Sequence, residues 1–196
     1  MNPKQAALGV AASLLAGLLV LADPLPALQS PAPQQPAAAA FTAPEIRDTA
    51  GLKGPAQPVF FRHDVHAGQY QLDCRYCHYT AEYAPTPGIP SMKTCMGCHL
   101  IAGAAIPEVQ KVRQIATSNQ VIEWVKVNHL PPFVHFPHMR HVKGETAVKA
   151  QVTCQTCHGQ IERMARVYQV PSLKMGWCLD CHRKNKVTTD CSACHY

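Results

Sequence analysis

Five stretches of the sequence place two cysteines three positions apart, with a histidine directly after the second cysteine. All ten cysteines belong to such pairs. A disulfide framework needs no histidine at a fixed offset, whereas covalent attachment of c-type haem uses C-x-x-C-H. The two thiols form thioethers to the porphyrin and the histidine becomes the proximal iron ligand. The five motifs are Cys74, Cys77 and His78; Cys95, Cys98 and His99; Cys154, Cys157 and His158; Cys178, Cys181 and His182; and Cys191, Cys194 and His195.

Zinc is the main alternative for cysteine pairs of this kind. Tetrahedral zinc sites take four ligands and commonly use two C-x-x-C pairs for one metal. A fifth pair and a histidine at an unchanging offset have no role in such a site. The sequence therefore predicts five haem c groups, with iron, and no zinc.

Six histidines remain to serve as distal ligands. A Phe-x-His-x-x-His frame occurs twice, and a further histidine precedes a Pro-Pro pair. Histidines three positions apart can point at different haems. If every iron is six-coordinate, five distal histidines are needed. The predicted distal ligands are His63, His66, His129, His138 and His141.

Three other residues stay open as distal ligands. His135 lies three positions before His138, although we favour a role at the surface or beside a propionate. Met92 and Met175 each lie three positions before a haem cysteine, and a thioether ligand raises the potential of a haem iron relative to histidine. Packing in the interior is the commoner role of such a methionine.

The chain contains an internal duplication. Phe61-x-His63-x-x-His66 is followed by the first motif, "IPSMK" and the second motif, and Phe136-x-His138-x-x-His141 is followed by the third motif, "VPSLK" and the fourth. The sequence therefore predicts two dihaem modules, at about 58–105 and 129–183, with the fifth haem in 184–196.

A mostly irregular domain with short α-helices, 58–196, is expected to hold these modules. This polypeptide is too short for an independent apolar core beside five haems, so the porphyrins must form the interior. Each attachment motif should lie on a helical turn. Pro107 followed by Val109, Val112 and Ile115 predicts one helix that stops near residues 118–119, and residues 121–127 should be extended or form one further short turn.

The N-terminal residues 1–22 are predicted to form a transmembrane anchor. The run from Ala6 to Ala22 carries no charge and spans about 26 Å as a helix. A signal peptide cleaved before Asp23 is the alternative. Residues 23–57 are rich in proline and alanine and should form an extended linker. Lys4 favours an inside N-terminus, which predicts a single-pass cell-membrane protein whose haem domain is extracytoplasmic, in the periplasm.

The net charge of +6 is the feature that could suggest a nucleic-acid partner. Propionates of five haems would largely neutralise it, so no nucleic acid is expected. With a histidine available for every iron, no open position for a substrate is implied. We therefore predict an electron-transfer protein without a catalytic site; a free periplasmic shuttle and a multihaem reductase remain alternatives.

The same residues resemble known cytochromes. The Phe-x-His-x-x-His frame ahead of C-x-x-C-H resembles class III multihaem cytochromes. The segments "WVKVNHLPPFVHFPHMRHV" and "MGWCLDCHR" make 58–196 similar to the pentahaem cytochrome subunit of alternative complex III, a bacterial quinol:acceptor oxidoreductase. That resemblance implies integral membrane and iron–sulfur partner subunits of a quinol-oxidising complex. It also implies a monohaem cytochrome c or another soluble carrier as the acceptor.

Overall fold

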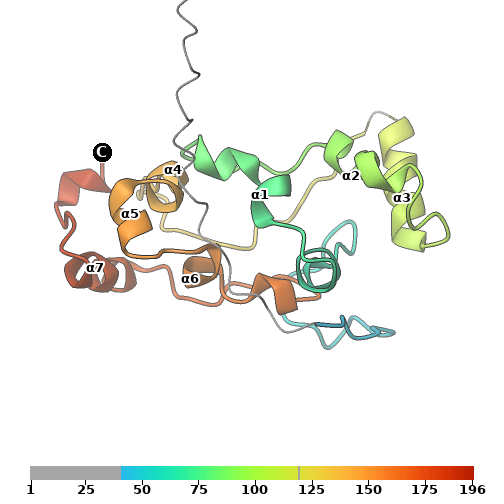
Figure 1. Cartoon of the computed structure of the whole chain (residues 1–196), viewed down its shortest axis with the longest axis horizontal. Helices are drawn as coiled ribbons and strands as arrows, with labels where there is room; N and C mark the ends of the chain where they lie inside the picture. The colour runs from blue at the N-terminus through green and yellow to red at the C-terminus, as the bar shows by residue number, and fades with distance from the viewer. Residues whose placement is uncertain (1–40, 119) are drawn as a thin grey trace, which may run out of the picture. The chain divides into compact units, whose positions relative to one another are not determined.

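The computed structural model describes residues 41–118 and 120–196, which belong to one of the two compact units of the chain, Pro33–Tyr196. These residues form short helices joined by irregular segments, with no β-strand among them (Figure 1). The prediction of a mostly irregular domain with short helices is therefore confirmed for the described part. The elements are η1 (Asp64–Gln69), α1 (Cys74–Cys77), η2 (Tyr79–Glu82), α2 (Met92–His99), α3 (Pro107–Thr117), α4 (His138–Val142), α5 (Glu145–Lys149), α6 (Cys154–His158), η3 (Ile161–Arg163), α7 (Met175–Lys184) and η4 (Cys191–Ala193).

All five attachment motifs lie on helical turns, as predicted. They occupy α1, α2, α6, α7 and the 3₁₀ turn η4. Local caps start two of these short helices. The Asp73 carboxylate accepts a hydrogen bond from the Arg75 amide at 2.7 Å, and Thr153 forms a capping box with Thr156. These caps fix the turns on which the first and third cysteine pairs are presented.

The predicted helix after the second motif is α3. Pro107 stands in its first turn with Glu108, and its buried side chains are Val109 and Val112. A proline costs little in the first turn because the amide there has no partner within the helix. The helix packs against α2 and so supports the second attachment motif. Residues 120–127 form no regular element, in agreement with the expected extended segment.

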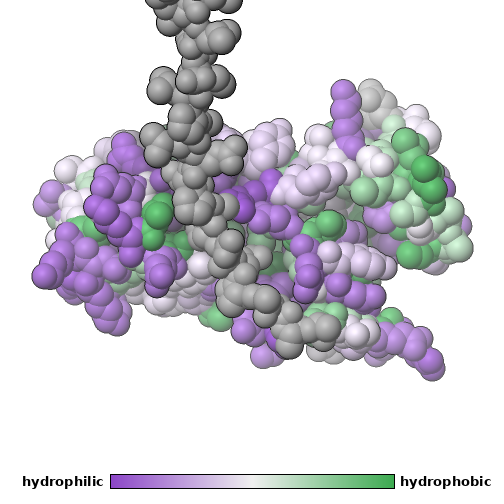
Figure 2. All heavy atoms as spheres, in the orientation of Figure 1, coloured by the Kyte–Doolittle hydropathy of each residue, from purple (hydrophilic) through white to green (hydrophobic). Residues whose placement is uncertain are grey.

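The polypeptide encloses little apolar core. Large apolar side chains lie at the surface instead, such as Ile101 at 88% exposure, and Figure 2 shows an apolar patch over the region of α2 and α3. A domain of this length ordinarily buries most of such side chains. The buried apolar residues in the described ranges are Val59, Val109, Val112, Met164, Ala165 and Leu173.

In the part of the chain that the structure describes, no helix has the length and apolar character needed to span a bilayer. The predicted anchor, 1–22, lies outside the described residues, as does much of the predicted linker. The last part of that linker, 41–57, is described and contacts the domain. Gln57 exchanges two 2.9 Å hydrogen bonds with the backbone of Val125, and Arg62 donates to the Pro44 carbonyl.

Candidate functional site

The structure places three predicted distal histidines close to predicted proximal ones, in what we call opposed pairs. Each of three pairs joins one histidine of a Phe-x-His-x-x-His frame to the histidine of an attachment motif. The ring centroids are 5.9 Å apart for His66 and His99, 6.4 Å for His138 and His158, and 6.0 Å for His141 and His182.

These spacings fit one metal ion between two imidazoles. Metal–imidazole bonds of about 2 Å, as in zinc sites, on both sides of one ion would place the ring centroids roughly 6 Å apart. Elsewhere in the described ranges, no group of three or more His, Cys, Asp or Glu side chains is arranged to hold a metal. A haem iron needs only two ligands from the protein, because the porphyrin supplies the others. The opposed pairs therefore suit haem iron.

Backbone carbonyls fix the orientation of these rings. A carbonyl only accepts hydrogen bonds, so each Nδ1 in such a contact carries the proton and leaves the Nε2 lone pair for a metal. Six Nδ1 atoms make such a contact, and one of them belongs to His195 of the fifth motif. The hydrogen bonds run from His66 to Arg62 O (2.8 Å), His99 to Ala102 O (3.0 Å), His138 to Pro85 O (3.1 Å), His141 to Pro137 O (3.1 Å), His182 to Thr188 O (2.6 Å) and His195 to Phe133 O (3.0 Å).

One phenylalanine orders both histidines of each frame. Phe61 stacks on His66 at 4.4 Å and meets His63 edge-on at 4.8 Å. Phe136 repeats both contacts, at 4.2 Å with the second framed histidine and 4.8 Å with the first. The phenylalanine of the frame is thus a positioning residue. The two modules share geometry as well as sequence.

His63 of the first frame and His78 of the first motif lie close enough for their charges to interact. Burial, and after it the charges of His78 and His66, lower the pKa of His63 to about 4. The His63 Nδ1 is buried without a hydrogen-bond partner within the described part. His63 is therefore neutral at physiological pH, as a metal ligand must be.

Burial also lowers the pKa of the other framed histidines. It is the largest cause for His66, His138 and His141, and for the proximal His158. Transfer out of water disfavours an imidazolium cation, which keeps these rings neutral. The half-buried frame thus presents uncharged imidazoles at neutral pH, the form that a metal ligand requires.

The fifth motif has a different environment. Phe133 contacts the ring of His195 at 5.6 Å, and His135 stacks on Tyr196 at 4.4 Å. His129, the predicted fifth distal ligand, has its Nε2 at 3.1 Å from the Lys126 carbonyl. The structure does not bring His129 opposite His195, so its role stays a prediction.

The two methionine alternatives lie at helix starts. Met92 is the first residue of α2 and Met175 is the first residue of α7, where its side chain is 59% exposed. At the second and fourth motifs the place opposite the proximal ring is already taken by a framed histidine. The geometry favours histidine over methionine at both positions.

None of the ten cysteines, all of which lie in the described ranges, forms a disulfide. The thiols of Cys74 and Cys154 are hydrogen-bonded to each other, and this contact is the largest cause of the raised pKa of Cys154. Burial raises the pKa of Cys157 to about 11. Cys154 and Cys157 are thus thiols at neutral pH and open to thioether formation.

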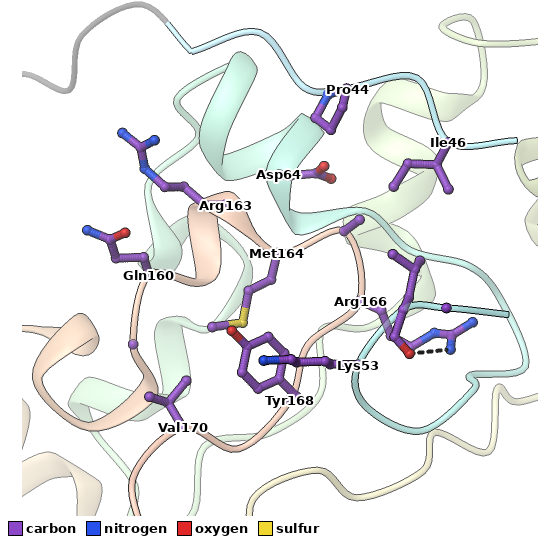
Figure 3. Close-up of a pocket in the computed structure, with 14 residues that line it drawn as sticks. Pro44, Ile46, Lys53, Asp64, Gln160, Arg163, Met164, Arg166, Tyr168 and Val170 are labelled. Atoms are coloured by element: carbon purple, nitrogen blue, oxygen red, sulfur yellow. Dashed lines mark hydrogen bonds between the residues drawn. The ribbon is translucent and has the colours of Figure 1, made fainter. Parts of the chain in front are cut away.

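A cavity of about 650 Å³ lies beside the third motif (Figure 3). Its wall combines residues 44–53 with Asp64 and residues 159–170, and Arg166 donates to the Leu52 carbonyl across it. It is lined by no histidine and no cysteine. The cavity is therefore separate from the opposed imidazole pairs.

Sequence reasoning missed the groups that hold the histidine rings. Most are backbone carbonyls, such as those of Pro85, Ala102 and Thr188. No residue type marks a carbonyl in a sequence. The repeated phenylalanine was visible as part of the frame, but its stacking role needed the fold.

Comparison with known proteins agrees with this geometry at a coarser level. No protein-family model matches the chain. The chain is 26% identical over 156 residues to the multihaem cytochrome c subunit of menaquinone reductase from Nitratidesulfovibrio vulgaris. The match covers 70% of this chain and 74% of that subunit. The similarity, the helical architecture and the ten cysteines together support a haem-binding protein that is similar to multihaem cytochromes c.

Proposed function

We propose that this chain is the electron-transfer subunit of a membrane quinol:acceptor oxidoreductase of the alternative complex III type. The opposed imidazole pairs carry the proposal, because their spacing suits one iron and their Nδ1 bonds leave Nε2 free. The similarity to a subunit of menaquinone reductase supports a place in a quinone-linked complex.

Five haem c groups are proposed, one for each attachment motif. Each would supply one reversible one-electron centre. The framed histidines and their proximal partners would hold four of the irons: His63 with His78, His66 with His99, His138 with His158, and His141 with His182. For the fifth, His195 would be the proximal ligand and His129 the distal one.

The protein's own contribution is to hold and orient these ligands. Phe61 and Phe136 fix the framed rings, and the carbonyl contacts set their tautomer. With two histidines assigned to each iron, no ligand position would remain for a substrate, so the chain would carry no catalytic site. Its partners would be integral membrane and iron–sulfur subunits, with a monohaem cytochrome c or soluble carrier as acceptor.

A location at the cell membrane is proposed with it. Residues 1–22 would anchor the chain by a single span, with the haem domain in the periplasm. The uncharged run from Ala6 to Ala22 supports this, as does the need of haem attachment for an exported chain.

The decisive experiment is purification of the native protein from membranes with its haems counted. We expect five haems per chain by alkaline pyridine spectroscopy and mass spectrometry. We also expect low-spin ferric signals of His/His type and co-purifying integral membrane subunits. A soluble, partner-free protein would support the shuttle instead. A high-spin ferric signal that responds to small anions would support a reductase, and a colourless chain would overturn both the haem assignment and the function.

A further inference from the structure

The two modules can be aligned in sequence, with a few extra residues in the second module between the frame and its two motifs. Phe61 corresponds to Phe136 in the frames, and Cys74 corresponds to Cys154 in the first motif of each module. Local contacts repeat under this correspondence. Arg75 donates to Glu82 at 3.4 Å, and at the equivalent positions Gln155 donates to Glu162 at 3.4 Å. The modules therefore share internal geometry.

The contacts between the modules are reciprocal. The Asp64 amide donates to the Met164 carbonyl at 3.2 Å, and the Met139 amide donates to the Ala84 carbonyl at 3.3 Å. Asp64 and Met139 each follow the first framed histidine of their own module. Met164 and Ala84 each lie ten residues after the first cysteine of the other module. Each frame is thus hydrogen-bonded to the turn behind the other module's first motif.

Side-chain packing repeats the reciprocity. η1 packs against η3, and α4 packs against η2. Gly68 lies so close to η3 that an added Cβ would stand 2.2 Å from the Glu162 carbonyl oxygen. At the equivalent junction the Lys143 ammonium lies 4.6 Å from the centre of the Tyr83 ring. Both junctions are closely packed.

Equivalent residues meet where the modules join. The thiols of Cys74 and Cys154, the first cysteine of each module, are hydrogen-bonded to each other. The proximal His158 also lies close enough to its equivalent, His78, for their charges to interact. In a two-fold arrangement a residue meets its own equivalent only near the axis. The axis therefore passes between the first and third motifs.

Within each module the attachment sites are neighbours through a shared frame. The two histidines of each frame are three positions apart and lie close to that module's two motifs. The fifth motif adjoins the fourth. His182 Nδ1 donates to Thr188 on the short connection between them, and the charge of Cys194 acts on Cys178.

We propose that the two dihaem modules form a pseudo-two-fold pair, so that the five attachment sites follow one another in space as second, first, third, fourth and fifth. This order rests on the proposed function, since it concerns where the haems would lie. It differs from the chain order at one step. The third site adjoins the first, and the second site becomes one end of the row, with the fifth site at the other.

Iron positions in the native holoprotein test this order directly. Diffraction at the iron absorption edge locates each iron beside its own cysteine pair. We expect the iron at Cys154 and Cys157 to have its nearest neighbours at the first and fourth motifs, and the second motif's iron to have one neighbour. An iron of the second motif between those of the first and third would overturn the order and leave the proposed function standing. An iron-free protein would overturn both.

A solution experiment makes the same distinction with matched variants. His138→Met marks the third haem with a His/Met signature whose midpoint potential can be followed on its own. Into this background one places either Cys95→Ala/Cys98→Ala, which removes the second haem, or Cys178→Ala/Cys181→Ala, which removes the fourth. In the proposed order only removal of the fourth haem shifts the marked potential. Equal shifts in both variants would mean that the sites follow the chain order.

Discussion

At the residue scale, the histidines differ in which ring nitrogen contacts a backbone carbonyl. Six Nδ1 atoms donate to backbone carbonyls, and five of these six belong to the three opposed pairs. A histidine whose Nδ1 is held in this way offers its Nε2 at a fixed angle. His129 differs from them, because its Nε2 and not its Nδ1 contacts a backbone carbonyl, that of Lys126.

Replacement of a framed histidine should change one haem only. For His141→Met we expect one His/His low-spin signal to become a His/Met signal and one of the five midpoint potentials to rise, because a thioether stabilises ferrous iron. Electron paramagnetic resonance with a redox titration measures both. The control is His135→Met, whose ring stacks on Tyr196 outside the frame and should leave all signals unchanged. An unchanged spectrum in His141→Met would refute the assignment of this ligand.

The buried carboxylate of Asp64 should be important for stability. It is fully buried, and Arg62 Nε donates to it at 2.9 Å while also binding the Pro44 carbonyl through Nη2. Removal of one partner of a buried ion pair costs about 3–5 kcal/mol. We expect Asp64→Leu to lower the free energy of unfolding of the holoprotein by that amount in denaturant titration.

An exposed ion pair provides the control for Asp64. Glu145 and Lys149 form a 2.7 Å pair on the surface of α5, with both side chains more than 70% exposed. Solvent screens such a pair, so Glu145→Gln should leave the midpoint of unfolding unchanged. Equal losses in the two variants would show that the burial of Asp64 is not what matters.

At the scale of elements, the sequence predicted the helices whose formation depends on nearby residues alone. Pro107 and the valines of α3 specified that helix, and the cysteine pairs specified helical turns. The helices η1, η2 and η3 were not predicted. Their places in the fold depend on hydrogen bonds between residues far apart in the chain, from Asp64 to Met164 and from Met139 to Ala84. The frames were recognised as ligands, but which motif each histidine faces depends on that packing and cannot be read from spacing alone.

The junction of η1 and η3 should tolerate no added methyl group at Gly68. A Cβ there would stand 2.2 Å from a backbone oxygen of η3, and backbone cannot move aside as a flexible side chain can. Overpacking of this kind costs about 1–3 kcal/mol. We expect Gly68→Ala to lower the thermal midpoint of the holoprotein with its haem count unchanged. Gly51→Ala, where nothing lies within 4 Å, is the matched control and should unfold as the wild type does.

At the scale of the whole molecule, the described polypeptide buries too few apolar side chains to fold by itself. Its buried set holds six apolar residues, while Ile101, Leu100 and Tyr83 are more than 60% exposed. The hydrophobic contribution from so small a core falls short of the chain entropy lost on folding. Porphyrins at five sites would supply the missing apolar surface.

Folding should therefore depend on haem attachment. A chain produced without haem attachment is expected to show no cooperative thermal transition by circular dichroism and no slowly exchanging amides in α3. The holoprotein should show both, because porphyrin contacts stabilise only the folded state. The amides of α3 are the sharpest probe, since Val109 and Val112 make it the best buried helix. A cooperative transition in the haem-free chain would contradict the idea that the haems form the core.

The reciprocal hydrogen bonds of Asp64 and Met139 carry a consequence for how such a molecule can be assembled. A surface that is complementary to its own copy forms a closed pair without further instruction. One module expressed alone should therefore dimerise head to head, with two polypeptides in place of one. Two separate modules would come apart on dilution. In a single chain the connecting segment fixes the effective concentration of one module around the other, so the pairing no longer depends on protein concentration.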